Sequence, residues 1–195
     1  MFDLLLENIV RRDVHLAAEE VHIVESLFVH KKYRKHQYIL QEGEVATHDN
    51  FIIKGLAKTF RVDANEQEHI LRFTPEEWWV GDLASFLSGS PSIYNVDCLE
   101  DTEVLRISSK DLDTLCERVP KMNKYFRLLY QKSIVSYNLR LTSSLSKSAA
   151  DRYEEFIKNF PQIGQRVPNH MIASYLGITP QSLSRIRSQA LSRKR

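Results

Sequence analysis

The sequence predicts an α+β protein in which an antiparallel β-roll is followed by a long helix and a small helical C-terminal domain. Three observations lead to this prediction. Short runs rich in β-branched and aromatic residues crowd residues 27–107, helical spacing of apolar residues returns after residue 108, and acidic residues stop at Glu155. Strands at such close spacing favour an antiparallel roll of the jelly-roll type over alternating β–α–β units.

The elements follow in order along the chain. Residues 8–26 show helical spacing without Gly or Pro and predict one leading helix, and residues 27–107 predict the strands of the roll. A short helix is expected around residues 108–119 and a long one over residues 121–145. The segment "TSSLSKSAAD" then predicts a hinge, and "RYEEFIKNF" predicts a helix that ends at Pro161.

Composition excludes several classes of protein. A chain of 195 residues with 43% hydrophobic content can bury a core, and no apolar run approaches the roughly 20 residues that span a bilayer. Asp3 and Glu7 precede any basic residue, so the start does not resemble an export signal. Cys98 and Cys116 lack metal-ligand spacing. We therefore expect a cytoplasmic protein without a membrane contact, a metal or a cofactor.

The long helix is apolar on two sides. The two rows are Met122, Phe126, Tyr130, Ile134, Tyr137 and Leu141, and Tyr125, Leu128, Val135 and Leu139. One row can pack on the roll, and the other predicts coiled-coil pairing with a second copy of the chain. The predicted homodimer interface consists of Phe126, Tyr130, Ile134 and Tyr137. The alternative is a helix sandwiched inside a monomer.

Charge divides the chain unevenly. Residues 1–139 carry 17 basic and 22 acidic side chains, whereas residues 140–195 carry 10 and 3. Such a basic C-terminal module is typical of proteins that bind a polyanion, either nucleic acid or an anionic surface.

The segment "HMIASYLGITPQSLSRIR" has the spacing of a helix-turn-helix. Ala173 is small where two helices would cross, and Gly177 suits a left-handed turn. Thr179 can cap a second helix that begins at Pro180. The apolar seam between the helices would comprise Ile172, Leu176, Ile178, Leu183 and Ile186. This pattern predicts a motif that binds double-stranded DNA.

The exposed side of the second helix would carry the DNA contacts. Arg185 is expected to read guanine and Gln181 adenine, because their side chains can make paired hydrogen bonds with those bases. Phosphate contacts are expected from hydroxyls and from the terminal cations. The full predicted set is Asn169, His170, Gln181, Ser182, Ser184, Arg185 and Ser188, with Arg193, Lys194 and Arg195 at the phosphates.

The order of roll, long helix, hinge and helix-turn-helix resembles the Crp/Fnr family of bacterial transcription regulators over nearly the whole chain. A second likeness is "VGDLASFLSGSPSIYNV", which is similar to the phosphate-binding cassette of the family's cyclic nucleotide-binding roll. The resemblance implies a sensory roll over residues 1–120, a dimerisation helix and hinge over residues 121–145, and a DNA-binding domain over residues 146–195. It also implies RNA polymerase as a partner. The family's C-terminal β-hairpin wing is not evident.

The resemblance further implies an effector pocket. Its residues would be Gly81, Asp82, Leu83, Ala84, Ser85, Ser92, Ile93 and Tyr94 from the cassette, with Tyr137 and Asn138 from the long helix. Ser92 stands where the family has an arginine for the cyclic phosphate, and no Arg or Lys lies between Val80 and Glu103. We therefore expect a small-molecule effector of unknown identity and no ordinary binding of cyclic AMP.

Other functions fit fewer features. A metal-dependent jelly-roll enzyme needs clustered histidine and carboxylate ligands, whereas His48 and His69 stand alone in the roll. A regulatory subunit that does not bind DNA is the main alternative, but it leaves the acid-free C-terminal segment unexplained. We therefore expect a transcription regulator and not an enzyme.

Overall fold

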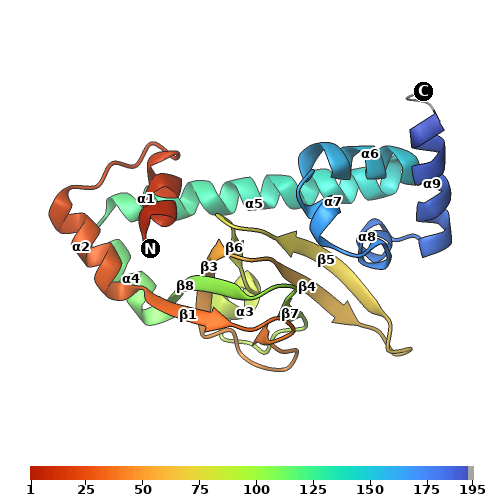
Figure 1. Ribbon diagram of the computed structural model, residues 1–195. Helices are drawn as coiled ribbons and strands as arrows, with labels where there is room; N and C mark the ends of the chain where they lie inside the picture. The colour runs from red at the N-terminus through yellow and green to blue at the C-terminus, as the bar shows by residue number, and fades with distance from the viewer. Residues whose placement is uncertain (193–195) are drawn as a thin grey trace.

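The computed structural model describes residues 1–192, so Arg193, Lys194 and Arg195, with their predicted phosphate contacts, lie outside the described residues. Figure 1 shows three parts: a β-roll, a long helix α5 (Lys121–Ser146) that runs across it, and a group of C-terminal helices at the far end of α5. This arrangement confirms the predicted α+β fold with a roll, a long helix and C-terminal helices.

The roll consists of two antiparallel sheets. One has the strand order β1-β8-β3-β6, and the other has the order β2-β7-β4-β5. A short helix, α3 (Leu83–Ser88), connects β6 to β7. The strands are β1 (Val29–Tyr33), β2 (Tyr38–Leu40), β3 (His48–Lys54), β4 (Ala57–Val62), β5 (Glu68–Thr74), β6 (Trp79–Val80), β7 (Asn95–Cys98) and β8 (Thr102–Ser108).

The N-terminal region departs from the prediction of one helix over residues 8–26. It forms α1 (Asp3–Val10) and α2 (Ala18–Leu27), separated by a turn. Asp13 has a φ of 55°, a left-handed conformation that Asp tolerates better than most residues, and its amide donates to Val10 O at 2.8 Å. The single-helix prediction was wrong because helical spacing alone does not reveal such a break.

Helix α4 (Ser109–Arg118) leads from the roll into α5. Met122, Tyr125 and Phe126 of α5 are buried in the same core as the roll. The Trp79 indole donates to the Tyr125 hydroxyl at 2.9 Å, and that hydroxyl donates to Asn8 Oδ1 at 2.9 Å. The first turns of α5 therefore belong to the roll.

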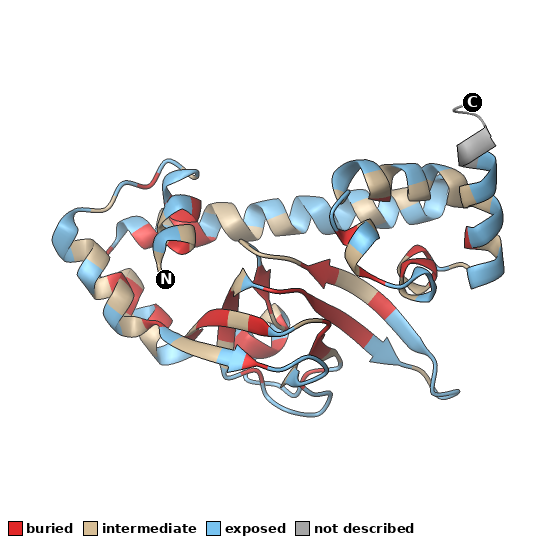
Figure 2. Cartoon of the chain, viewed as in Figure 1, coloured by how far each residue is buried: buried red, intermediate tan, exposed pale blue. Residues whose placement is uncertain are grey.

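Burial changes abruptly along α5. Figure 2 shows buried positions only near its N-terminal end. Phe126 is 5% exposed, whereas Ile134 is 60% exposed. The structure thus corrects the prediction of Phe126 at a dimer interface, because its ring lies between Trp79 and Tyr125 of the same chain.

The C-terminal helices are α6 (Ala149–Asn159), α7 (Ile163–Arg166), α8 (Asn169–Leu176) and α9 (Pro180–Ser192). They share a second hydrophobic core with strands β4 and β5, in which Phe73 of the roll packs against Phe156 of α6. No strand follows β8 among the described residues.

Candidate functional site: a C-terminal helix pair and an interdomain cavity

The helix pair α8 and α9 is joined by the turn that the sequence predicts. Gly177 ends α8 with a φ of 66°, and the Ile178 amide donates to Ala173 O at 3.0 Å. The Ser182 amide donates to Thr179 Oγ1 at 3.2 Å, which caps α9 at its predicted start, Pro180. Local sequence chemistry therefore determines the angle between the two helices.

A buried seam fixes the orientation of α9. Ile172, Ala173 and Leu183 are at most 1% exposed, and Leu176 is also buried. Because this seam fixes the inner side of α9, the opposite side faces solvent. Gln181, Ser184, Arg185 and Ser188 are all exposed, and the Arg185 guanidinium has no hydrogen bond or ion pair within the described residues.

The other predicted DNA contacts have more varied surroundings. Ser182 is half-buried, and its hydroxyl accepts from Thr179 Oγ1 at 3.0 Å. His170 is exposed at the start of α8. Asn169 is exposed, and its side-chain oxygen accepts from Arg187 of α9. The sequence analysis did not single out Arg187, which ties α9 to the start of α8.

Polar bonds hold the C-terminal helices on the roll of the same chain. The Arg166 guanidinium donates to Glu76 at 2.9 Å and to Glu100 at 2.7 Å. The Ser174 hydroxyl donates to Glu68 O at 2.7 Å and accepts from the Ile70 amide at 3.1 Å. The paired, bidentate geometry at Arg166 makes this a specific docking contact.

At the cassette-like corner, which comprises residues 80–96, polar groups hydrogen-bond to one another. Asp82 caps α3 by accepting from the amides of Ala84 at 3.0 Å and Ser85 at 3.3 Å. The buried Ser92 hydroxyl donates to the second Asp82 oxygen at 2.9 Å, and Ser85 Oγ donates to Ser90 O at 2.6 Å. This closed network offers no cation to a phosphate.

The structure does not assemble the predicted effector set. A cavity of about 810 Å³ is bordered by only three of its members, Gly81, Leu83 and Tyr137. Ile93 is 51% exposed. The other seven members of the predicted effector set do not line this cavity: Asp82, Ala84, Ser85, Ser92, Ile93, Tyr94 and Asn138. Several side chains of the corner hydrogen-bond to one another, and an effector pocket there stays a prediction.

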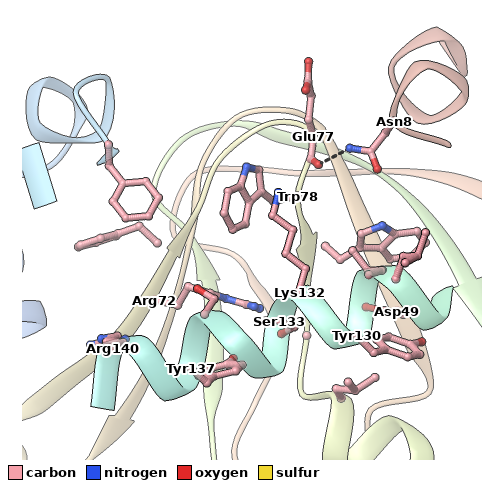
Figure 3. Close-up of a pocket in the computed structure, with 18 of the residues that line it drawn as sticks. Asn8, Asp49, Arg72, Glu77, Trp78, Tyr130, Lys132, Ser133, Tyr137 and Arg140 are labelled. Carbon is pink, nitrogen blue, oxygen red and sulfur yellow. Dashed lines mark hydrogen bonds between the residues drawn. The ribbon is translucent and has the colours of Figure 1, made fainter. Parts of the chain in front are cut away.

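The 810 Å³ space, called here the interdomain cavity, lies among the roll, α1, α5 and the C-terminal helices (Figure 3). Trp78 and Trp79 line it from the roll, Tyr137 from α5, and Phe160 from the end of α6. Figure 3 shows Lys132 rising from α5 toward Trp78, with Arg72 beside Ser133. The cavity therefore contacts both the roll and the C-terminal helices.

Two cations that line the interdomain cavity, Arg72 and Lys132, have no carboxylate within ion-pair distance in the described residues. The Arg72 guanidinium and the Lys132 amine make no hydrogen bond or ion pair within residues 1–192, and Arg72 Nε is buried. Arg140 donates to two carbonyls, Ile70 O at 3.4 Å and Tyr175 O at 3.2 Å, and lies over the Tyr175 ring. Burial lowers the pKa of Arg140.

The two carboxylates of the cavity differ. Glu77 pairs with Arg11 at 2.6 Å. Asp49 is 8% exposed and has no ion pair in the described part of the chain, and burial raises the pKa of its carboxyl to about 7. Asp49 is therefore partly neutral near pH 7, and the cavity carries a net positive charge.

No pocket role was predicted for Arg72, Lys132 or Arg140, because a cation for the effector was expected only within the cassette-like segment. Arg72 stands between Leu71 and Phe73 in the middle of β5. A basic residue inside an apolar strand could have indicated a binding site. Side chains alternate between the two faces of a strand, so Arg72 lies on the same face as the buried Thr74.

Other sites are not supported by clusters of side chains. In the described range there is no group of three or more His, Cys, Asp or Glu residues that could hold a metal ion. Nor does any described helix have the length and apolar character needed to cross a membrane.

Comparisons with known proteins agree on the fold. The cyclic nucleotide-binding domain family matches residues 30–119. The catabolite activator protein of Thermus thermophilus is 23% identical, with 94% of this chain and 87% of that chain covered and a TM-score of 0.56. FixK2 from Bradyrhizobium japonicum is 17% identical, with 86% of each chain covered and a TM-score of 0.75.

A third similar structure is the c-di-GMP responsive global regulator CLP of Xanthomonas campestris. It is 14% identical, with 91% of this chain and 93% of that chain covered and a TM-score of 0.69. Curated protein sequences give no significant match. Residues 30–119 thus match the cyclic nucleotide-binding domain family, and the chain has the fold of Crp/Fnr-type regulators, as the sequence resemblance predicted.

Proposed function

We propose that this chain, with its match to the cyclic nucleotide-binding domain family and the fold of Crp/Fnr-type regulators, is a dimeric transcription regulator that binds specific DNA sequences. One observation carries the proposal: the helices α8 and α9 pack on a buried seam, and α9 presents an acid-free outer face with an unpartnered Arg185. A helix that enters the major groove of DNA needs an exposed, uncharged or basic outer face and an inner face packed against the rest of the protein.

Base recognition is assigned to the exposed side of α9. The Arg185 guanidinium is free to donate two hydrogen bonds to guanine, and Gln181 can pair with adenine. Ser182, Ser184, Ser188 and His170 are placed at phosphates, where contacts position the protein without reading sequence. Arg187 holds Asn169 and so orients the start of α8 against α9.

A second copy of the chain is the proposed partner of α5. Ile134, Leu141 and Leu145 are 60%, 60% and 81% exposed, and their spacing by seven and four residues places them on one side of the helix. Coiled-coil pairing along this side would bury them. Two-fold symmetry would then present two copies of α9 to one duplex.

Binding of cyclic AMP in the family's usual manner is not part of the proposal. A cyclic phosphate at the cassette-like corner would meet the Asp82 carboxylate and the Ser92 hydroxyl in place of a cation. Calorimetric titration should therefore show no saturable binding of cyclic AMP or cyclic GMP at micromolar concentration. Location in the cytoplasm and contact with RNA polymerase belong to the same proposal.

Selection of bound duplexes from a random DNA pool tests the proposed function. We expect enrichment of near-palindromic sequences whose half-sites lie about one helical turn, roughly 34 Å, apart. A pool that shows no enriched sequence after repeated rounds would reject sequence-specific binding and favour a regulatory subunit that acts through protein contacts alone.

A further inference from the structure

The interdomain cavity has apolar walls that suit a flat ligand. Eight aromatic side chains from the roll, α5, α6 and α8 border it: Phe73, Trp78, Trp79, Tyr130, Tyr137, Phe156, Phe160 and Tyr175. Its volume of about 810 Å³ lies within the range of roughly 300–1,000 Å³ that is usual for small-molecule sites. Aromatic walls favour a planar apolar group, which they can stack against.

The charged groups of the cavity favour an anion. Arg72 reaches it from β5 with its Nε buried and without a partner, although a buried donor is costly to leave unpaired. Lys132 adds a second unpaired cation from α5, and Figure 3 shows both side chains above the same stretch of that helix. An incoming anion would satisfy donors that the chain itself leaves open.

The nearby carboxylates do not remove this preference. Glu77 is engaged by Arg11 at 2.6 Å, so its charge is already balanced. Asp49 is buried and makes no ion pair in the described part of the chain, and the charge of Arg72 offsets only part of the effect of burial on the pKa of its carboxyl. Its raised pKa, about 7, means that much of its negative charge is absent at neutral pH.

We propose that the interdomain cavity binds a small organic anion with an aromatic body, and that Arg72 holds the carboxylate or phosphate of that anion. A guanidinium matches both groups through two parallel hydrogen bonds. Lys132 adds charge, and Trp78 and Trp79 offer apolar surface to the rest of the ligand. This site is distinct from the cassette-like corner, which contributes only Gly81 and Leu83 to the cavity.

Such a ligand would touch the roll and the helix pair at once. Phe156 and Phe160 border the cavity from α6 and its C-terminal end, and Tyr175 borders it from α8. Binding there would bias how the helix pair sits on the roll, because a ligand stabilises the arrangement that it contacts best. This regulatory consequence rests on the proposed function, whereas ligand binding itself does not.

Tryptophan fluorescence offers a direct test, since both tryptophans of the chain line the cavity. The probes are 2-naphthoate and 1-naphthyl phosphate, compared with uncharged 2-naphthylmethanol. We expect saturable quenching by both anions and at least tenfold weaker binding of the alcohol. The Arg72→Gln variant should bind the anions roughly tenfold more weakly, and Arg72→Lys should show intermediate affinity.

Arg61→Gln provides the matched control. Arg61 lies on the neighbouring strand β4, is exposed and does not line the cavity, so this variant removes one arginine charge elsewhere and should bind like wild type. The thermal unfolding midpoint of each variant shows whether it is folded. Arg72→Gln should fold because the guanidinium makes no bond within the described residues.

Three results would overturn the proposal: no quenching by either anion at millimolar concentration, equal or tighter binding of the alcohol, or equal anion affinity in wild type and both Arg72 variants. Quenching is measured without DNA, so a protein that binds naphthoate but no duplex would reject the proposed function and keep this site. A protein that binds duplex but neither anion would reject this site and keep the proposed function.

Discussion

The two halves of α5 share one apolar pattern but meet different surroundings. In residues 121–130 the pattern is covered by the chain itself, and Tyr125 and Phe126 are buried against Trp79. In residues 131–146 the same spacing leaves Ile134 and Leu141 each 60% exposed. The difference shows that helical periodicity indicates where a helix needs a partner, while only the fold shows whether the chain provides it.

The largest effect should come from placing charge on the exposed half. The double substitution Ile134→Glu with Leu141→Glu should convert dimers to monomers, because each buried aliphatic side chain contributes about 1.5–3 kcal/mol and symmetry doubles the number lost. Sedimentation velocity measures the change. Leu87→Glu alters an equally exposed leucine on α3 (63% exposed) and should leave the dimer intact. Dimers that survive the double substitution would place the interface elsewhere.

The next effect should fall on the buried half. Phe126→Ala should lower the free energy of unfolding by about 3–5 kcal/mol, since it leaves a cavity among packed aromatic rings. Urea titration of wild type and variant measures the loss, with Leu87→Glu as an exposed-site control expected to stay near wild type. A loss that depends on protein concentration would instead return Phe126 to the dimer interface.

The sequence predicted well wherever local chemistry decides the structure. Gly177, Thr179 and Pro180 have the turn, cap and helix start that were expected, because each residue type restricts its own backbone. It failed where tertiary contacts decide. No local signal separates Phe126 from Ile134, and Arg72 becomes a cavity residue only when β5 meets α5.

The hydrogen bond between Ser92 and Asp82 is another tertiary contact that local sequence does not reveal. The segment was predicted as an effector pocket from its likeness to a phosphate-binding cassette, and the missing arginine was visible in the sequence. That Ser92 would bond to Asp82 could not be predicted, because the pairing needs the chain to return across α3.

A smaller effect on DNA binding tests the proposed role of the exposed half of α5 in pairing two chains. If it pairs two chains to present two copies of α9, Arg185→Ala should weaken binding to a selected duplex by about 1–3 kcal/mol per half-site and relax preference at one base pair. Fluorescence anisotropy of a labelled duplex measures both changes. Lys158→Ala removes an exposed charge near the end of α6, within the acid-free stretch that follows Glu155, and should keep the base preference. An equal loss on every sequence would assign Arg185 to a phosphate.

The smallest effect at each step of the measurement, on the order of 1 kcal/mol per pH unit, concerns Asp49, which lines the cavity with Tyr130 where α5 leaves the core. Burial raises its pKa to about 7, so between about pH 4 and pH 7 the folded state binds more protons than the unfolded state. This contribution to stability is present at low pH and is lost as pH rises through 7, with a slope on the order of 1 kcal/mol per pH unit.

Asp49→Asn should remove that slope and make the protein more stable than wild type at about pH 8. Urea midpoints across this pH range measure the effect. Asp113→Asn, at an exposed carboxylate of α4, serves as the control and should retain the wild-type slope. Parallel pH profiles for wild type and Asp49→Asn would show that Asp49 is already ionised throughout the range.

The central claim is that a second chain covers the exposed half of α5 and that the pair presents two copies of α9 to one duplex. Sedimentation equilibrium of the wild-type protein, alone and with a selected duplex, tests it most directly. The account predicts a dimer at micromolar concentration and two chains per duplex. A monomeric free protein that binds the same duplex as a single chain would contradict it.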